Sequence, residues 1–176
     1  MDANRVRETA VLVEDSQPHA GVSFVNCQIF GDLIVKPTNS GMVRFTSCGF
    51  FGSMEGARGV GLAKIDAGRS RVSFSNCHFY ALRALNGKPL IHGVSGRISL
   101  VNCVFMNSKR TYSDPLPPLP NGEKGWNPDH IFLDSGMISA TIIGNEFYAP
   151  LRIINKSEGK LVIANNVDNS DDVASR

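Results

Sequence analysis

Three ionisable side chains in the middle of the chain are candidates for acid and base chemistry. Asp66, His92 and Asp134 each follow a short apolar stretch, in segments that read alike: LAKIDAG, PLIHGVSG and HIFLDSG. A carboxylate or an imidazole in such a place can give or take a proton, and paired carboxylates are the groups that cleave glycosidic bonds. These three residues are therefore the candidate catalytic set.

Cationic side chains near the same segments are candidates for holding a ligand. Lys64 and His130 lie within two of these segments, and Arg152 lies near the start of a related one, LRIINKSEG. A basic side chain can pair with a carboxylate of an acidic ligand. Trp126, in a long polar stretch, offers an apolar ring for stacking on a sugar. These four residues are the candidate binding set.

The four cysteines do not point to a metal. Cys27, Cys48, Cys77 and Cys103 form no C-x-x-C pair, which argues against a zinc knuckle. The acidic residues of the long polar stretch are too scattered to suggest a calcium site. We expect neither a metal nor another cofactor.

A repeated segment indicates how the candidate residues are positioned. Each copy alternates apolar and other residues and then carries a Cys or Asn followed by a further apolar residue. The alternation predicts a strand with one buried face, and the Asn or Gly before the Cys or Asn predicts a sharp bend. The copies are VSFVNCQIF (22–30), VRFTSCGFF (43–51), VSFSNCHFY (72–80), ISLVNCVFM (98–106), ATIIGNEFY (140–148) and LVIANNVDN (161–169).

A further strand precedes each copy and usually ends at a glycine, so each unit holds three short strands and three corners. Units of variable length that share one pattern are typical of a solenoid. We therefore predict an all-β fold, a right-handed parallel β-helix of about six three-strand rungs. It forms a single domain over 1–176, with rungs over about 10–168 and a polar tail over 169–176. An antiparallel sandwich or barrel is the rival fold, but it does not explain the repeated corner residues.

Stacked rungs would bring like residues into ladders about 4.8 Å apart. One predicted ladder fills an inner corner with small or polar residues, and its neighbour fills the core with large apolar ones. We expect the four cysteines to be free and buried. The corner ladder is Cys27, Cys48, Cys77, Cys103, Asn145 and Asn166, and the core ladder is Ile29, Phe50, Phe79, Phe105 and Phe147.

The V-x-F-x-N-C-x-F pattern and its variant around Asn145 resemble the pectate-lyase-like superfamily of right-handed parallel β-helices, over roughly residues 10–168. That family includes polysaccharide lyases, polygalacturonase-like hydrolases and phage tailspikes. The resemblance implies a polysaccharide or glycan partner, a cleft along the strand that carries the candidate residues, and an extracellular or cell-surface location. The catalytic signatures of polygalacturonases are incomplete here, and the chain looks like the later rungs of a longer protein.

Three function classes stay open at this point. The chain is part of a carbohydrate-active protein (a lyase or glycoside hydrolase), a non-catalytic structural or adhesive segment, or a fragment without activity of its own. The candidate residues also suit an ordinary solvated sheet face. Asp66 and Asp134 lie two rungs apart, which is about 10 Å and slightly beyond the separation of about 6.5–9.5 Å in inverting glycosidases.

Composition excludes other partners. The formal net charge is +2, with 42% hydrophobic and 19% charged residues, which favours neither nucleic acid nor an anionic membrane surface. No apolar run is long enough to span a bilayer. Uncapped end rungs would leave strand edges open, so we expect self-association through the ends.

Overall fold

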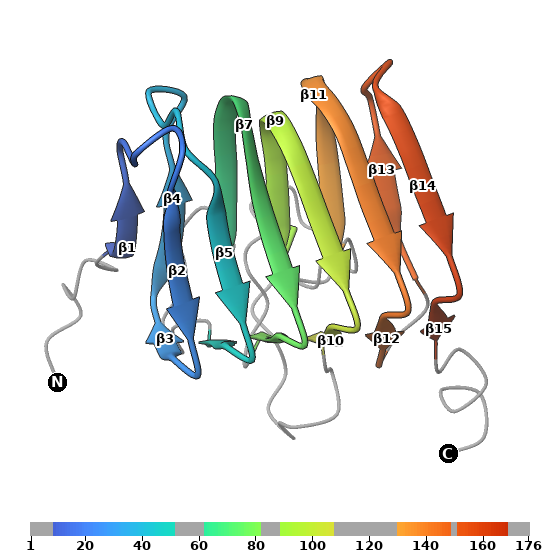
Figure 1. Ribbon diagram of the computed structural model, residues 1–176. Coiled ribbons are helices and arrows are strands. Elements are labelled where there is room, and N and C mark those ends of the chain that lie inside the picture. The colour runs from blue at the N-terminus through green and yellow to red at the C-terminus, as the bar shows by residue number, and fades with distance from the viewer. Residues whose placement is uncertain (1–8, 52–61, 82–88, 108–129, 149–150, 169–176) are drawn as a thin grey trace, which may run out of the picture.

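The computed structural model describes residues 9–51, 62–81, 89–107, 130–148 and 151–168, and within them the protein is all-β and has no helix. Every strand pairing is parallel (Figure 1). One sheet has nine strands: β1 (Thr9–Val13), β2 (Val22–Val25), β4 (Asp32–Val35), β5 (Val43–Thr46), β7 (Ala63–Ser75), β9 (Ile91–Val101), β11 (Ile131–Ile143), β13 (Ile153–Asn155) and β14 (Lys160–Ala164). The other has six: β3 (Gln28–Phe30), β6 (Gly49–Phe51), β8 (His78–Ala81), β10 (Val104–Asn107), β12 (Glu146–Phe147) and β15 (Val167–Asp168).

Strands from successive repeats pair with one another in sequence order. The six-stranded sheet runs β3-β6-β8-β10-β12-β15, which takes one strand from each of the six predicted copies. We number the repeat units by these strands, so that unit 1 ends with β3 and unit 6 with β15. Equivalent residues are in register: Phe50 pairs with Phe79, and Phe79 with Phe105. The predicted alignment of the copies is thereby confirmed.

The bend before each Cys or Asn is also confirmed. Asn26, Ser47, Asn76 and Asn102 have φ values between 52° and 55°, and Gly144 has 67°. Asparagine and glycine tolerate this left-handed conformation better than other residues do. The chain can therefore turn sharply from the nine-stranded sheet into the six-stranded one at the same place in each unit.

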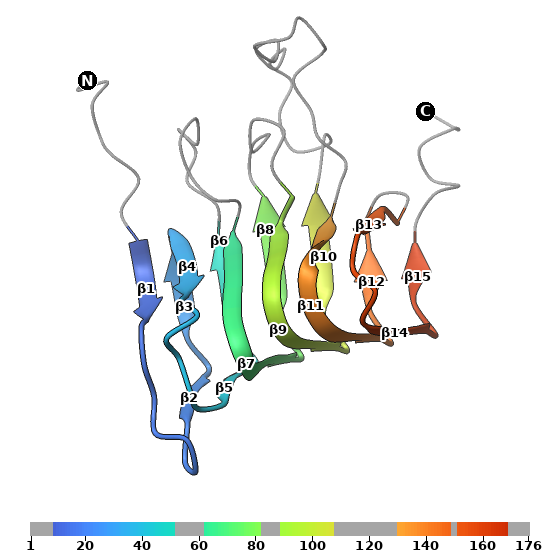
Figure 2. The same cartoon turned by 90° about the horizontal axis from the view of Figure 1, so that it is seen from above.

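The expected break between the first two strands of each unit is wrong for units 3, 4 and 5. There β7, β9 and β11 run on as single strands of 13, 11 and 13 residues. Figure 2 shows these long strands bent, so that each contributes to two sides of the molecule. Gly68 and Gly96 lie within the bends with φ of 59° and 92°, and shifts of register beside them let the pairing continue.

The corner ladder is held by hydrogen bonds as well as by packing. From the second unit on, the side chain of each ladder residue points to a backbone carbonyl of the unit before it. This carbonyl belongs to the residue three positions N-terminal to the ladder residue of that preceding unit. The contacts are Cys48 Sγ to Phe24 O, Cys77 Sγ to Phe45 O, Cys103 Sγ to Phe74 O, Asn145 Nδ2 to Leu100 O and Asn166 Nδ2 to Ile142 O.

Cysteine and asparagine fill the same role in this ladder. Asn145 Oδ1 accepts the backbone N–H of Cys103 at 2.8 Å, and Asn166 Oδ1 accepts the backbone N–H of Asn145 at 2.9 Å. The Cys and Asn side chains alike contact the carbonyl of the equivalent residue in the preceding unit. All four cysteines are free, as predicted. Three of them are buried, whereas Cys27, in the first unit, is only half-buried.

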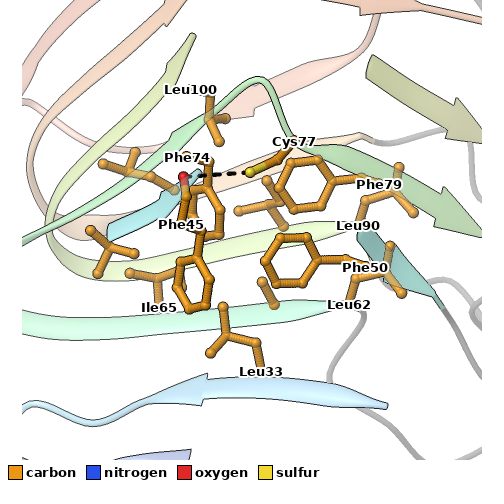
Figure 3. Packing of buried hydrophobic residues seen from close by; sticks show 14 of the residues in the cluster. Leu33, Phe45, Phe50, Leu62, Ile65, Phe74, Cys77, Phe79, Leu90 and Leu100 are labelled. Atoms are coloured by element: carbon orange, nitrogen blue, oxygen red, sulfur yellow. Dashed lines mark hydrogen bonds between the residues drawn. The ribbon is translucent and has the colours of Figure 1, made fainter. Parts of the chain in front are cut away.

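Two stacks of aromatic rings fill the core beside this ladder (Figure 3). Phe50, Phe79, Phe105 and Phe147 are each 0% exposed, which confirms the predicted core ladder. Phe50 and Phe79 stack with centroids 4.8 Å apart, and Phe74 meets Phe79 edge-on at 5.3 Å. Edge-to-face contact between the two stacks ties the two sheets together.

Candidate functional site

Four of the predicted site residues lie on the outer side of the nine-stranded sheet, and the sheet brings two of them together. The four are Lys64, Asp66, His92 and Asp134. His92 on β9 and Asp134, which follows Leu133 on the neighbouring β11, form a pair with Nε2 and Oδ2 3.1 Å apart. Their side chains are 29% and 39% exposed, so both can reach solvent. This pair is a hydrogen-bonding and ionisable centre on an open face.

Two neighbours of this pair were missed by the sequence analysis. Phe132 pairs with His92 across the strands, and their rings meet edge-to-face at 5.3 Å. The ammonium of Lys156 lies 4.9 Å from the centroid of the Phe132 ring, a distance at which a cation is attracted to the ring. Alternation in HIFLDSG could have identified Phe132 as an outward residue, whereas the place of Lys156 follows only from the strand register of unit 6.

The strand register places Lys64 directly beside His92. The four residues His92, Phe132, Asp134 and Lys156 therefore form a cluster with Lys64 at its edge. We call this group of five the outer cluster. It combines one acidic group, two lysines, an imidazole and an aromatic ring on a partly exposed sheet surface.

Asp66 does not join Asp134. Its Oδ1 accepts a hydrogen bond from the Ser95 hydroxyl at 2.5 Å, and the same hydroxyl oxygen accepts the backbone N–H of Gly68. Among the described residues, no interaction links the two carboxylates. The structure therefore places each predicted carboxylate with its own partner and does not bring them together as a pair.

Arg152 lies in a different column from the one predicted. Ile153 pairs with Ile131, so Ile154 occupies the place next to Phe132 and Arg152 lies opposite His130. The prediction placed Arg152 on the outward strand face with His92. In the segment Leu151-Arg152-Ile153-Ile154 the two adjacent isoleucines break the alternation, so its phase could not be read from the sequence.

His130 is not on the outer surface with the other residues predicted to bind a ligand. It is 0% exposed and lies against the rings of Phe105 and Phe147. Its Nδ1 accepts the backbone N–H of Arg152 at 3.3 Å, and its Nε2 has no hydrogen-bond partner. Burial, aided by the nearby charge of Arg152, lowers the pKa of His130 from 6.5 to about 4.

The six-stranded sheet has an outer aromatic column that the sequence analysis did not single out. Phe30, Phe51 and Tyr80 are in register, and Phe30 is 72% exposed. The rings of Phe30 and Phe51 stack 4.9 Å apart. The rings of Phe51 and Tyr80 lie 6.1 Å apart and are tilted by 57°, so the stacking does not extend to Tyr80.

Trp126 and most of the long polar stretch around it lie outside the described residues. Within the described ranges, no group of three or more His, Cys, Asp or Glu side chains is placed to hold a metal ion. The same ranges contain no helix with the length and apolar character needed to cross a membrane.

Comparison with known proteins does not add to this description. No protein-family model matches the chain, and neither a curated protein nor a solved structure matches it. The fold is therefore described at the level of its strands: an all-β protein built from parallel strands in two sheets.

Proposed function

We propose that this chain is a right-handed parallel β-helix of six rungs that binds a polysaccharide on its outer cluster. The fold proposal is supported by the pairing of each repeat unit with the next, in order and in parallel. Connections between parallel strands of one sheet are right-handed in about 98% of cases, which supports the hand of the coil. The pectate-lyase-like resemblance points to the same architecture.

The outer cluster has the chemistry that a sugar chain needs. The His92–Asp134 pair offers both hydrogen-bond donors and acceptors to neighbouring hydroxyl groups. Lys156 and Lys64 lie on either side of it, one from the following unit and one from the preceding unit. A chain laid along the stack of rungs would place acidic sugars near these ammonium groups, so we propose a uronate-containing polysaccharide.

Binding is favoured over hydrolysis. Asp66 is engaged by Ser95 and Asp134 by His92, and no interaction between the two carboxylates occurs in the described part of the chain. A glycosidase needs an acid and a second carboxylate facing the same bond. The arrangement therefore supports recognition without cleavage. The single observation that carries the proposal is the His92–Asp134 pair with lysines on both flanks.

A glycan array combined with turnover assays tests this function. We expect the protein to be retained on one or more acidic polysaccharides, and to release neither reducing ends nor unsaturated uronides from them. Turnover of a bound glycan would overturn the proposal of binding without cleavage. A lack of retention on every glycan would overturn the function itself.

A structural or adhesive role is the second candidate, and the last unit gives it specific support. The strands β14 and β15 each pair with the strand of the preceding unit, β11 and β12. Ile163 on β14 and Val167 on β15 are nevertheless 46% and 60% exposed. Exposed apolar side chains on end strands favour pairing with another chain. We propose that self-association through the ends accompanies glycan binding, as expected for an extracellular or cell-surface segment.

A further inference from the structure

Strands with one unpaired edge lie at both ends of the stack of units. Among the described residues, β2 and β3 of unit 1 pair only with β5 and β6, and β14 and β15 of unit 6 pair only with β11 and β12. Figure 1 shows β2 and β14 at opposite ends of the molecule. Because all pairings are parallel, the edge that unit 1 leaves open is of the kind that each later unit uses to join the unit before it.

Two backbone hydrogen bonds recur at each junction between units, on either side of the ladder residue. The N–H of the bend residue donates to a carbonyl of the following unit, as from Gly144 to Ala164 at 3.1 Å. The carbonyl of the ladder residue accepts the N–H of the residue after the next ladder residue, as from Val167 to Asn145 at 2.9 Å. Both bonds occur at all five junctions, so they define how one unit follows another.

The last unit carries the same groups but has no following unit in the described part of the chain. These groups are the N–H of the bend residue Asn165, which has a positive φ of 54°, and the carbonyl of the ladder residue Asn166. If unit 1 of a second copy takes the next place, Asn165 N–H meets the carbonyl of Val25, and the carbonyl of Asn166 meets the N–H of Gln28. Val25 and Gln28 occupy the positions that make these bonds at the other junctions. The two ends are therefore complementary in hydrogen bonding.

The apolar column of the core also continues across such a junction. Phe24 is the end ring of the stack that it forms with Phe45 and Phe74. Ile163 lies at the other end of the same column of paired residues. Ile163 is 46% exposed and Phe24 is half-buried. Docking the two ends covers both side chains with each other, which removes apolar surface from water.

The charges at the two ends match in the same register. Val13 and Asn155 are the first and last members of one column of paired residues. Glu14 and Lys156 directly follow them, so the Glu14 carboxylate of the docked copy lies opposite the Lys156 ammonium. Units 1 and 2 already show this geometry, because Lys36 Nζ lies 2.6 Å from Glu14 Oε1. Opposite charges at the ends favour this register over others.

We propose that the chain assembles head to tail, with unit 1 of one copy docked on unit 6 of another as a seventh unit. This inference rests on the self-association proposed above and does not depend on the glycan. The interface joins two different surfaces, so each assembly keeps one open end of each kind and can add further copies. An interface between like ends would instead stop at two copies.

One residue of the last unit opposes this docking. Asp168 occupies the place that Phe147 has in the core ladder, so it would face Ile29 of the docked copy. Its carboxylate accepts the backbone N–H of Leu151 at 2.9 Å. A charge on the inward side of an end strand limits edge-to-edge pairing, and covering it with an apolar side chain costs free energy. Asp168 therefore limits the strength of the assembly.

Carbodiimide cross-linking of the full chain, with mass spectrometry and light scattering, tests the register and the mode. In a mixture of isotope-labelled and unlabelled protein we expect a Glu14–Lys156 cross-link between copies, and masses that rise beyond a dimer. The Glu14–Lys36 cross-link is the internal control. Absence of the Glu14–Lys156 cross-link while the control forms would overturn the proposal. Dimers as the largest species would overturn the head-to-tail mode alone, whereas strict monomers would also overturn the proposed self-association.

A gain of assembly is the second test. Asp168→Phe gives unit 6 the residue that units 2 to 5 carry in the core ladder. It should strengthen the assembly by at least about tenfold, because a phenyl ring then covers Ile29. Val167→Phe is the matched control, since it adds the same ring to the opposite face of β15, and its effect should be clearly smaller. Equal effects of the two variants, or no gain from Asp168→Phe, would contradict the proposed docking.

Discussion

The buried His130 should make the stability of the fold sensitive to acid. One side of its ring meets the ring of Phe147 edge-to-face in the core. On the other side, Nδ1 accepts the backbone N–H of Arg152 at the beginning of unit 6. Protonating Nδ1 would replace this acceptor with a donor and add a positive charge near Arg152. The neighbouring Asp168 partly offsets this effect.

The size of the effect follows from the pKa of His130, which falls from 6.5 to about 4 in the folded chain. Each pH unit between the two pKa values is worth about 1.4 kcal/mol, so the free energy of unfolding changes by about 3 kcal/mol. Above pH 6.5 the imidazole is neutral in both states and the stability is complete. As the pH falls from 6.5 to 4 only the unfolded chain takes up the proton, and the stability is lost.

Urea unfolding of wild type and His130→Leu at pH 7.5, 5.5 and 4 separates this effect from the titration of carboxylates. Leucine is the matched replacement, because Leu62 and Leu90 are buried at the equivalent positions of units 3 and 4. The wild type should lose about 3 kcal/mol relative to the variant between pH 7.5 and pH 4. The exposed His78 is the control, and His78→Ala should follow the wild type. Parallel pH profiles for wild type and His130→Leu would refute the reasoning.

Three further predictions concern the core, the thiols and the ends. Phe79→Ala should lower the free energy of unfolding by about 3–5 kcal/mol, because it opens a cavity in the stack. Phe51→Ala, at a partly exposed outward position, should cost clearly less, and equal losses would mean that the inward phase is wrong. Thiol titration of the unfolded, unreduced protein should find four thiols, and a count of zero would contradict the free cysteines. Light scattering should detect self-association that Ile163→Lys weakens; a strict monomer at high concentration would argue against open ends.

The repeat made the core of this fold predictable. Alternation located the buried Phe positions, and the Asn or Gly before each ladder residue located the bends. Both features are local, because each depends on a strand face or on a single backbone conformation. Their recurrence in six copies fixed the alignment, and the alignment carried over directly into the strand register.

The differences between the prediction and the structure have separate physical causes. Gly68 lies at a bend within β7 and Gly96 at a bend within β9, and neither glycine ends its strand. His130 was assigned to a ligand because of its chemistry, although Leu62 and Leu90 at the equivalent positions indicate a buried corner. Asp66 and Asp134 carry the right chemistry for a pair, but only the register and side-chain partners could tell that they stay apart.

The most direct test of the proposed function is the affinity of matched variants for the acidic polysaccharide selected on the array, measured by isothermal titration calorimetry. Asp134→Asn removes the charge that faces His92, and Lys156→Ala removes the cation beside Phe132. Glu146→Gln, on the six-stranded sheet, is the control. We predict that Asp134→Asn and Lys156→Ala each weaken binding at least tenfold and that Glu146→Gln leaves it unchanged. Unchanged affinity in the Asp134→Asn/Lys156→Ala double variant would contradict the assignment of the outer cluster as the binding site.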